Sequence, residues 1–289
     1  MQAIVVAGGR GIRLDPLTRV LPKPLLPVGD EPIAAILLRQ LRQAGVDEVI
    51  MCLGHLGDLI KAYFQDGGRF GLSIRYMQET APLGTAGPLA GIIDLAEDFL
   101  VVNGDEFTTL DFQAMFQYHI AHHADMTIAV QKKELVSAFG VLEVKKGRIV
   151  AYREKPKFDY WASMGIYVLN RRVVDFLQTG RRSDIPELVQ TLLLHDARIL
   201  SYYSQDMWLD IGTRDDLEKA QQAAVALGVC PRAVDDGVDN DRAEGCSGSN
   251  GLSRQELSVD ASGVAGNGCK RKGGEARADA QSQCADSYL

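Results

Sequence analysis

Cysteines, long apolar runs and export signals are scarce or missing in this sequence. Its 289 residues include five cysteines, an odd number with no CxxC pair, so a disulfide framework is not expected. No run of about 18 apolar residues occurs, which argues against a membrane-spanning helix. The first residues, MQAIVVAGG, lack a basic segment and a cleavage site, so no signal peptide is expected. These absences predict a cytoplasmic protein that is not attached to a membrane.

Positive charge is also in short supply. Lys and Arg number 31 against 38 Asp and Glu, which gives a net charge of −7. A general nucleic-acid-binding protein would show the opposite balance, so nucleic acid is not an expected partner. Any chemistry that needs cations must therefore depend on a local cluster of them.

Short apolar runs alternate with amphipathic ones through the first hundred residues. The pattern predicts strands at 3–7, 48–53, 73–77 and 99–103, and helices at 33–44, 56–65 and 86–96. Strands that alternate with helices indicate βαβ units. We therefore expect an α/β fold with a mainly parallel sheet and helices on both of its faces.

The pattern becomes more mixed after Asp105. We expect helices at 112–123, 173–177, 186–194 and 214–227, strands at 126–130, 164–169 and 197–203, and a hairpin whose strands flank Lys146-Gly147. From residue 231 onward Gly, Ser, Asp, Asn and Ala dominate, and no apolar period remains. The sequence thus predicts a folded domain at 1–228 and a disordered, low-complexity tail at 229–289.

A glycine-rich loop with several cations follows the first strand. The stretch AGGRGIRLDPLTRVLPKPLLPV (7–28) contains Gly8, Gly9 and Gly11, and also Arg13 and Lys23. Glycine amides can approach a polyphosphate closely, and cations can then neutralise its charge. A plain strand-to-helix turn would need only one or two glycines. Neither the dinucleotide fingerprint nor the P-loop is complete here, so the phosphates must be held in another way.

The same stretch resembles the signature of the sugar-1-phosphate nucleotidyltransferases, or NDP-sugar pyrophosphorylases. The similarity continues in the same order through six further segments, PLGTAGPL (82–89), VNGDEF (102–107), FGVLEV (139–144), REKP (153–156), MGIYVL (164–169) and WLDIGT (208–213). It covers about residues 1–227 and is greatest to mannose-1-phosphate guanylyltransferase-like members. The resemblance implies the Rossmann-like nucleotide-diphospho-sugar transferase fold. One departure is Ile12, where the family often has Thr.

The resemblance also implies a reaction and the residues that perform it. An NTP and a sugar 1-phosphate would give an NDP-sugar and pyrophosphate, by in-line attack of a sugar phosphate oxygen on the α-phosphorus. Asp105 and Asp210 would hold one Mg²⁺, Arg13 the leaving pyrophosphate, and Lys23 the α-phosphate side. Judged without the resemblance, Asp210 is better explained as the N-terminal cap of a helix, a position that Asp favours.

Two further groups of residues are implied for substrate binding. The nucleotide would be surrounded by the residues Ala7, Gly8, Gly9, Gly11, Glu79, Gly84 and Thr85. The sugar phosphate would contact Lys155, with Glu154 and Gly140 near the sugar hydroxyls. The sugar itself stays open, and mannose, a heptose and an amino sugar are all compatible with the sequence.

The identity of the base depends on one position. Glu79 stands five residues before Gly84, where family members that use UTP or dTTP typically have Gln. A carboxylate only accepts hydrogen bonds, so it matches the adjacent N–H donors of guanine, and GTP is the expected nucleotide. If Gln78 reads the base instead, the same chemistry with UTP or dTTP is the alternative.

A different class of function is also compatible with the resemblance. The protein could be a non-catalytic regulatory subunit that senses a nucleotide sugar. Such a subunit would have no reason to retain both metal carboxylates, Asp105 and Asp210, together with the cations Arg13, Lys23 and Lys155. A homo-oligomer is compatible with the sequence, which does not specify the oligomeric state.

Overall fold

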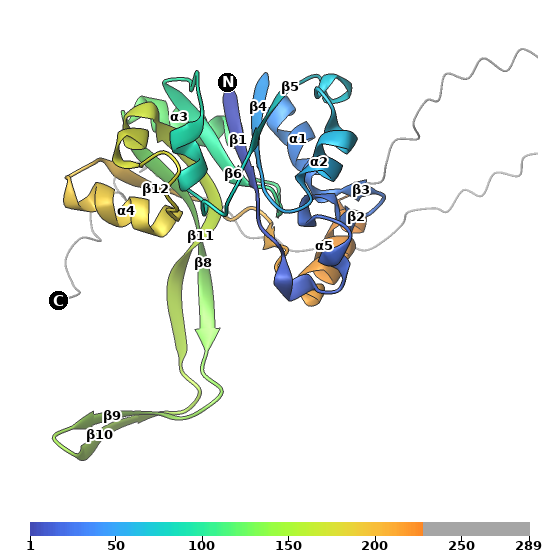
Figure 1. The fold of residues 1–289 in the computed structure, drawn as a ribbon. Helices are drawn as coiled ribbons and strands as arrows, with labels where there is room; N and C mark the ends of the chain where they lie inside the picture. The colour runs from blue at the N-terminus through green and yellow to red at the C-terminus, as the bar shows by residue number, and fades with distance from the viewer. Residues whose placement is uncertain (228–289) are drawn as a thin grey trace, which may run out of the picture. The chain divides into compact units, whose positions relative to one another are not determined.

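A seven-stranded sheet forms the centre of residues 1–227, the part of the chain that the computed structural model describes (Figure 1). These residues fall in one compact unit, Met1–Asp235, whereas the tail expected at 229–289 lies outside the described residues. In chain order the strands of the sheet are β1 (Gln2–Ala7), β4 (Glu48–Leu53), β5 (Ser73–Gln78), β6 (Asp98–Asn103), β8 (Met126–Val136), β11 (Lys157–Asn170) and β12 (Ile199–Tyr203).

The sheet is mixed and mainly parallel, as predicted. Its order is β12-β8-β11-β6-β1-β4-β5, and β11 alone runs antiparallel to its neighbours, β6 and β8. Every other strand of the sheet therefore ends at the same edge. In open α/β sheets this carboxyl edge is where ligands bind.

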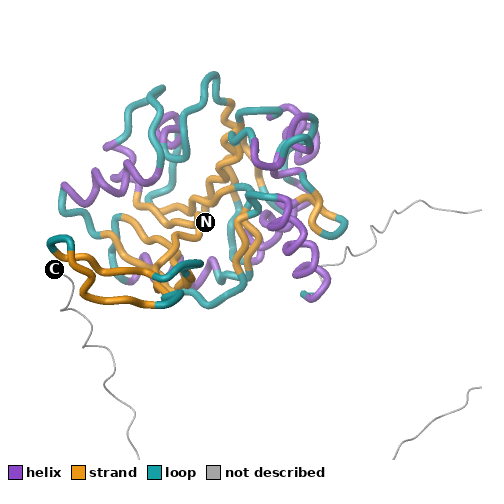
Figure 2. The backbone as a smooth tube through the Cα atoms, turned by 90° about the horizontal axis from the view of Figure 1, so that it is seen from below, coloured by secondary structure: helices purple, strands orange, loops and turns teal. Residues whose placement is uncertain are grey.

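Helices cover both faces of the sheet, which confirms the predicted layers (Figures 1 and 2). Helices α1 (Ile33–Gln43), α2 (Gly57–Phe64) and α3 (Phe112–Ala121) share one apolar cluster with the sheet, and α4 (Ile185–Leu194) belongs to the cluster on the opposite face. No helix within residues 1–227 has the length and apolar character needed to cross a membrane.

Helix α1 illustrates how these faces are held together. Its apolar residues recur at helical spacing, so Leu37, Leu38 and Leu41 all face the sheet and are fully buried. Gly45 follows the helix with a positive φ of 88°, the conformation that ends many helices. The prediction of a helix closed by glycine is therefore confirmed at this position.

Leu41→Ala should lower the free energy of unfolding by about 2–5 kcal/mol, because it leaves a cavity between α1 and the sheet. The same substitution at Leu194, which is 84% exposed at the end of α4, should change it by less than about 0.5 kcal/mol. Urea denaturation of both variants measures the difference. Equal losses would contradict the burial of this face of α1.

The last helix, α5 (Arg214–Ala226), packs on a third apolar cluster that includes Leu14, Phe107 and Ile211. A capping box starts it, since the Thr213 hydroxyl accepts from the Asp216 amide and the Asp216 carboxylate accepts from the Thr213 amide. The helix therefore fixes the segment just before it against the glycine-rich loop.

One predicted helix is absent, which corrects the expectation for residues 86–96. That segment contains only a 3-10 helix, η5 (Gly87–Gly91), followed by irregular backbone. Gly87, Pro88 and Gly91 disfavour a regular helix. The amides of Ala86 and Gly87 bond instead to the carbonyl of Ser183. The helix expected at 173–177 is likewise a 3-10 helix, η6 (Arg171–Phe176).

Several short elements were not predicted. The remaining 3-10 helices are η1 (Ile12–Leu14), η2 (Leu17–Arg19), η3 (Lys23–Leu25) and η4 (Gly68–Phe70). Short strand pairs join β2 (Pro27–Val28) to β3 (Glu31–Pro32), and β7 (Glu106–Thr108) to β13 (Trp208–Asp210). The expected hairpin is present as β9 (Val141–Lys145) and β10 (Arg148–Arg153), at the end of the long strands β8 and β11.

Candidate active site

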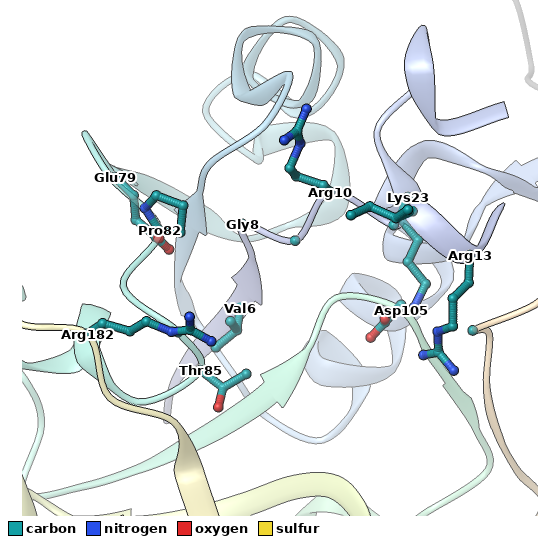
Figure 3. Close-up of a pocket in the computed structure, with 15 residues that line it drawn as sticks. Val6, Gly8, Arg10, Arg13, Lys23, Glu79, Pro82, Thr85, Asp105 and Arg182 are labelled. Atoms are coloured by element: carbon teal, nitrogen blue, oxygen red, sulfur yellow. Dashed lines mark hydrogen bonds and ion pairs between the residues drawn. The ribbon is translucent and has the colours of Figure 1, made fainter. Parts of the chain in front are cut away.

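A cavity of about 610 Å³ opens at the carboxyl edge of the sheet, where the glycine-rich loop leaves β1. In Figure 3, Arg13, Lys23 and Asp105 lie together at one end, and Glu79 and Pro82 lie at the other. The residues that line the cavity are Val6, Gly8, Gly9, Arg10, Gly11, Ile12, Arg13, Lys23, Glu79, Pro82, Gly84, Thr85, Asp105, Arg182 and Gly212.

The glycine-rich loop is held in a fixed shape beside this cavity. The buried Thr18 donates its hydroxyl to the Gly11 carbonyl at 2.9 Å, and Gly11 has a positive φ of 61°. A β-carbon on Gly8 would lie 2.8 Å from Oε1 of Glu79. A side chain on Gly8 would therefore press on the Glu79 carboxylate, which glycine leaves in place.

Two short strands bring the predicted metal ligands together. Strands β7 and β13 pair with Glu106 opposite Asp210, and the Ile211 amide donates to the Asp105 carbonyl at 3.3 Å. The Lys23 ammonium forms an ion pair with Asp105 and lies 3.7 Å from Asp210. Segments that are about a hundred residues apart in the sequence thus share one cation.

A third carboxyl group, Glu106, lies directly behind this pair. It is 3% exposed and accepts hydrogen bonds from the Trp208 indole at 2.7 Å and from the Asn103 amide at 3.2 Å. Burial, followed by the negative charge of Asp105, raises the pKa of Glu106 well above its usual value.

The three carboxyl groups fit a divalent cation. Asp105, Glu106 and Asp210 each offer an oxygen, and these atoms all lie within 4.8 Å of one another. Oxygen donors of this kind suit Mg²⁺ or Ca²⁺ better than zinc or copper. The Lys23 ammonium beside the two aspartates supplies positive charge at the same point.

At the far end of the cavity, Glu79 presents an unsatisfied carboxylate oxygen. Its Oε2 accepts from the Leu83 amide at 3.0 Å, while its buried Oε1 has no hydrogen-bond partner among residues 1–227. Burial raises the pKa of Glu79. Gln78 is exposed, does not line the cavity and donates to the Gly54 carbonyl at 3.3 Å. Of these two neighbours, Glu79 is the one that faces the cavity.

The loop that contains Gly84 and Thr85 is supported by the start of α4. The Thr85 amide donates to Asp184 at 3.0 Å, and the Thr85 hydroxyl accepts from the Ile185 amide at 2.9 Å. A β-carbon on Gly84 would lie 2.5 Å from the Ser183 carbonyl oxygen. Arg182, from this supporting segment, also faces the cavity (Figure 3).

Most of the residues predicted for the site lie around one space. The cavity is lined by Gly8, Gly9, Gly11, Arg13, Lys23, Glu79, Gly84, Thr85 and Asp105. Ala7 lines a smaller adjoining cavity with Lys23 and Asp105, and Asp210 joins the carboxylate cluster. By contrast, Gly140, Glu154 and Lys155 lie at the β9–β10 hairpin, outside the cavity lining.

Sequence analysis missed Glu106 and Arg182. Glu106 could have been found from the adjacent acidic pair Asp105-Glu106 at a strand end. Successive side chains of a strand point to opposite sides, so one acidic residue can face a ligand while its neighbour is buried behind it. Arg182 gave no signal in the sequence. It reaches the cavity only because residues 183–185 support a loop that lies about a hundred residues earlier.

The fold and the site together define a protein that handles phosphorylated ligands. It has a rigid glycine-rich loop, adjacent cations and a carboxylate cluster, all at the carboxyl edge of an α/β sheet. The family model described as Nucleotidyl transferase matches residues 2–226. The chain belongs to this nucleotidyl transferase family.

Curated relatives include enzymes with different nucleotides. The chain is 34% identical to a mannose-1-phosphate guanylyltransferase of Mycobacterium tuberculosis, over 80% of this chain and 66% of the relative. It is 32% identical to a UTP–glucose-1-phosphate uridylyltransferase of Synechocystis, over 76% and 62% of the two chains. It is 29% identical to a D-glycero-α-D-manno-heptose 1-phosphate guanylyltransferase of Aneurinibacillus thermoaerophilus, over 77% and 97%.

The chain thus spans about two thirds or less of the first two relatives and nearly all of the third. Among solved structures, HddC from Yersinia pseudotuberculosis superimposes with a TM-score of 0.61 at 23% identity, over 77% of this chain and 98% of the other. This likeness supports the nucleotide-diphospho-sugar transferase fold that the sequence resemblance implied.

Proposed function

We propose that this protein transfers a nucleoside monophosphate from an NTP, GTP in the first instance, to a sugar 1-phosphate. A phosphate oxygen of the sugar 1-phosphate forms a bond to the α-phosphorus, the bond from that phosphorus to the β-phosphate oxygen breaks, and pyrophosphate leaves. The nucleophile is already an anion, so no general base is needed. Catalysis then depends on positioning and on neutralising charge.

The observation that carries the proposal is the arrangement of the cavity from end to end. The glycine loop lies between the unsatisfied carboxylate of Glu79 at one end and the carboxylate cluster, with Arg13 beside it, at the other. A nucleoside triphosphate is a molecule with a hydrogen-bonding base at one end and a polyanion at the other. Glu79 at one end of the cavity can accept from the base, and the cations at the other end can neutralise the polyanion.

Arg13 and Lys23 would hold the phosphates. The Arg13 guanidinium packs over Gly212, where a β-carbon would lie 2.8 Å from its Nη2. This close packing fixes the cation beside the glycine loop, where it can bind the leaving pyrophosphate. Lys23 is 12% exposed and is oriented by its ion pair with Asp105, so it would face the α-phosphate with little freedom to move away.

Asp105 and Asp210 would hold Mg²⁺, with Glu106 behind them. The carboxyl oxygens available in this cluster are the ligands that Mg²⁺ prefers, and the cluster carries more acidic groups than Lys23 alone can balance. When bound, Mg²⁺ would supply positive charge to the phosphate groups. Asp105 and Asp210 orient their oxygens through the β7–β13 pair, and the hydrogen bonds to Glu106 hold that pair in register.

Glu79 supports GTP as the nucleotide. Guanine offers two adjacent donors, N1–H and N2–H, whereas uracil and thymine offer one N–H between two carbonyl oxygens. The free Oε1 of Glu79 can only accept when it is ionised. The similarity to a uridylyltransferase favours UTP or dTTP as the second candidate. Measuring pyrophosphate release from each NTP with a panel of sugar 1-phosphates tests both the activity and the nucleotide.

Glu79→Gln should reduce the preference for GTP over UTP, expressed as a ratio of kcat/KM values, by about 5- to 150-fold. That range corresponds to about 1–3 kcal/mol for one bidentate contact to a base. The amide would offer a donor where guanine requires an acceptor. Glu218→Gln, at an exposed position on α5, is the matched control. An unchanged nucleotide profile for Glu79→Gln would assign base recognition to another residue.

A further inference from the structure

Strands β8 and β11 continue beyond the sheet as an arm. The arm comprises residues 131–162: a stem in which Gln131–Val136 pairs with Lys157–Ala162, and the β9–β10 hairpin at its end. Figure 1 shows it leaving the body at the end of β8. Because β8 runs parallel to β1, the arm emerges at the same edge of the sheet as the glycine-rich loop. It therefore belongs to the active-site edge.

The hairpin has one apolar face and one charged face. Its register places Ile149 opposite Val144 and Tyr152 opposite Leu142, so these four side chains share a face. They are 65%, 59%, 63% and 46% exposed, respectively. The other face contains Glu143, Lys145 and Arg148, with Arg153 opposite Val141. Such alternation is typical of a strand pair that packs on another surface.

The stem is less clearly divided, because Val136 and Trp161, 52% and 57% exposed, share the side of its ion pairs. Leu135 lies opposite Phe158 on one side, while Lys132–Asp159 and Lys157–Glu134 form ion pairs of 2.6 and 3.0 Å on the other. Lys133 shares the side of Leu135, and its ammonium lies 4.9 Å from the ring of Trp208, which donates to Glu106. The side of the stem that holds Leu135 and Phe158 therefore faces the same way as the carboxylate cluster.

An exposed two-stranded ribbon with an apolar face is marginal in water and marks a surface that needs a partner. Nothing in the described part of the chain covers it. Residues 229–289 contain no Phe, Ile, Met or Trp, so they offer few large apolar side chains that could pack on the hairpin. A second copy of this chain is a better partner for the hairpin, because two arms related by a two-fold axis present the same apolar face to each other.

Charge favours the same partner. Residues 141–157 carry six Lys and Arg against two Glu, whereas the whole chain has a net charge of −7. A copy of this chain is therefore electrostatically attractive to the hairpin. Within one subunit, the hairpin turns away from the side of the sheet that carries β1, β4 and α5 (Figures 1 and 2). Lys155, exposed at the base of the hairpin, consequently does not line its own cavity.

We propose that two copies exchange arms across a two-fold axis, so that Lys155 and Glu154 of each subunit complete the sugar 1-phosphate site of the other. This proposal rests on the proposed function. Lys155 of the partner subunit supplies the cation for the sugar phosphate, and Glu154 of the partner subunit accepts from sugar hydroxyls. The active site is then shared between subunits, and a lone subunit binds the nucleotide without its acceptor.

Complementation between two inactive subunits is the decisive experiment. Asp105→Asn and Lys155→Ala are co-expressed with different tags and purified over both tags, so that every dimer holds one copy of each. One of its two sites then combines an intact Asp105 with Lys155 of the partner subunit. Each variant alone should be nearly inactive, and the mixed dimer should regain about half of the pyrophosphate release of the unmodified protein.

The possible failures are distinguishable. A mixed dimer as inactive as its parents would mean that the arm serves its own cavity, which overturns the proposal. Full activity of Lys155→Ala alone would remove Lys155 from the sugar phosphate site and overturn it as well. Failure of the proposed function is a different result, in which the unmodified protein releases no pyrophosphate with any pair of substrates.

A second experiment tests the interface without activity. Val144→Asp places a charge on the apolar face of the hairpin, and Val141→Asp places the same charge on the opposite face, across from Arg153. Light scattering should give twice the chain mass for the unmodified protein and for Val141→Asp, and a monomer for Val144→Asp with its melting temperature unchanged. A monomeric unmodified protein, or a Val144→Asp dimer, would contradict arm exchange.

Discussion

Asp105→Asn is expected to lower kcat by on the order of 10³-fold while the protein remains folded, a loss typical of removing one electrostatic contact to the transition state. Asn keeps the shape of the side chain but removes the charge that orients Lys23 and would hold the metal ion. Lys23 loses its ion pair with Asp105, but Asp210 remains 3.7 Å from its ammonium, so the melting temperature should change little.

Two measurements separate this result from general damage. Pyrophosphate release under saturating substrates gives kcat, and electron paramagnetic resonance of Mn²⁺ reports metal binding in the absence of turnover. Asp58→Asn is the matched control, since Asp58 has a 97% exposed side chain on α2 and should change neither readout. Full activity of Asp105→Asn with Mg²⁺, or unaltered Mn²⁺ binding, would show that the carboxylate cluster is not the metal site.

The sequence predicted those parts of the site that come from continuous segments. The run Ala3–Ala7 followed by Gly8, Gly9 and Gly11 indicated a buried strand with a phosphate loop, and Asp105 was expected at the end of another strand. Both predictions concern residues whose neighbours in the sequence are also their neighbours in the fold. Local periodicity is therefore sufficient to find them.

Other features depend on contacts between distant segments, and the sequence alone did not predict them. The pairing of β7 with β13 joins three residues to three, which is too short for an apolar period to be visible. The segment at 86–96 has apolar residues at helical spacing, but Gly87, Pro88 and Gly91 disfavour a helix and the Ser183 carbonyl accepts from its first amides. The hairpin at 141–153 was predicted, yet its direction away from its own cavity follows from the long β8–β11 pairing.

These distant contacts meet at Glu106, which links the two halves of the carboxylate cluster. Its oxygens accept from Asn103 at the end of β6 and from Trp208 in β13, so one buried carboxyl group holds both strands that position the aspartates. Buried polar groups of this kind stabilise one arrangement only when all of their partners are present. Whatever displaces Glu106 should therefore disturb stability and catalysis together.

Gly165→Ala is the substitution expected to do so, with a loss of about 2–5 kcal/mol in the free energy of unfolding. Gly165 lies in β11 with a positive φ of 71°, where alanine costs about 1–2 kcal/mol. Its new β-carbon would also overlap Oε1 of Glu106 and Nδ2 of Asn103. Separating these two atoms, which are hydrogen-bonded to each other, adds about 1–3 kcal/mol for an unsatisfied buried group.

Gly180→Ala separates the two causes. Gly180 has a nearly equal φ of 75°, but a β-carbon there meets no atom within 4 Å, so only the backbone contribution of about 1–2 kcal/mol should be lost. Urea denaturation gives both values, and kcat should fall for Gly165→Ala alone. In the Glu106→Ala background, Gly165→Ala should cost less than it does in the unmodified protein, because the overlap has been removed. If the two glycine variants were equally stable, Glu106 would be free to move aside, and it could not be the group that holds the two aspartates together.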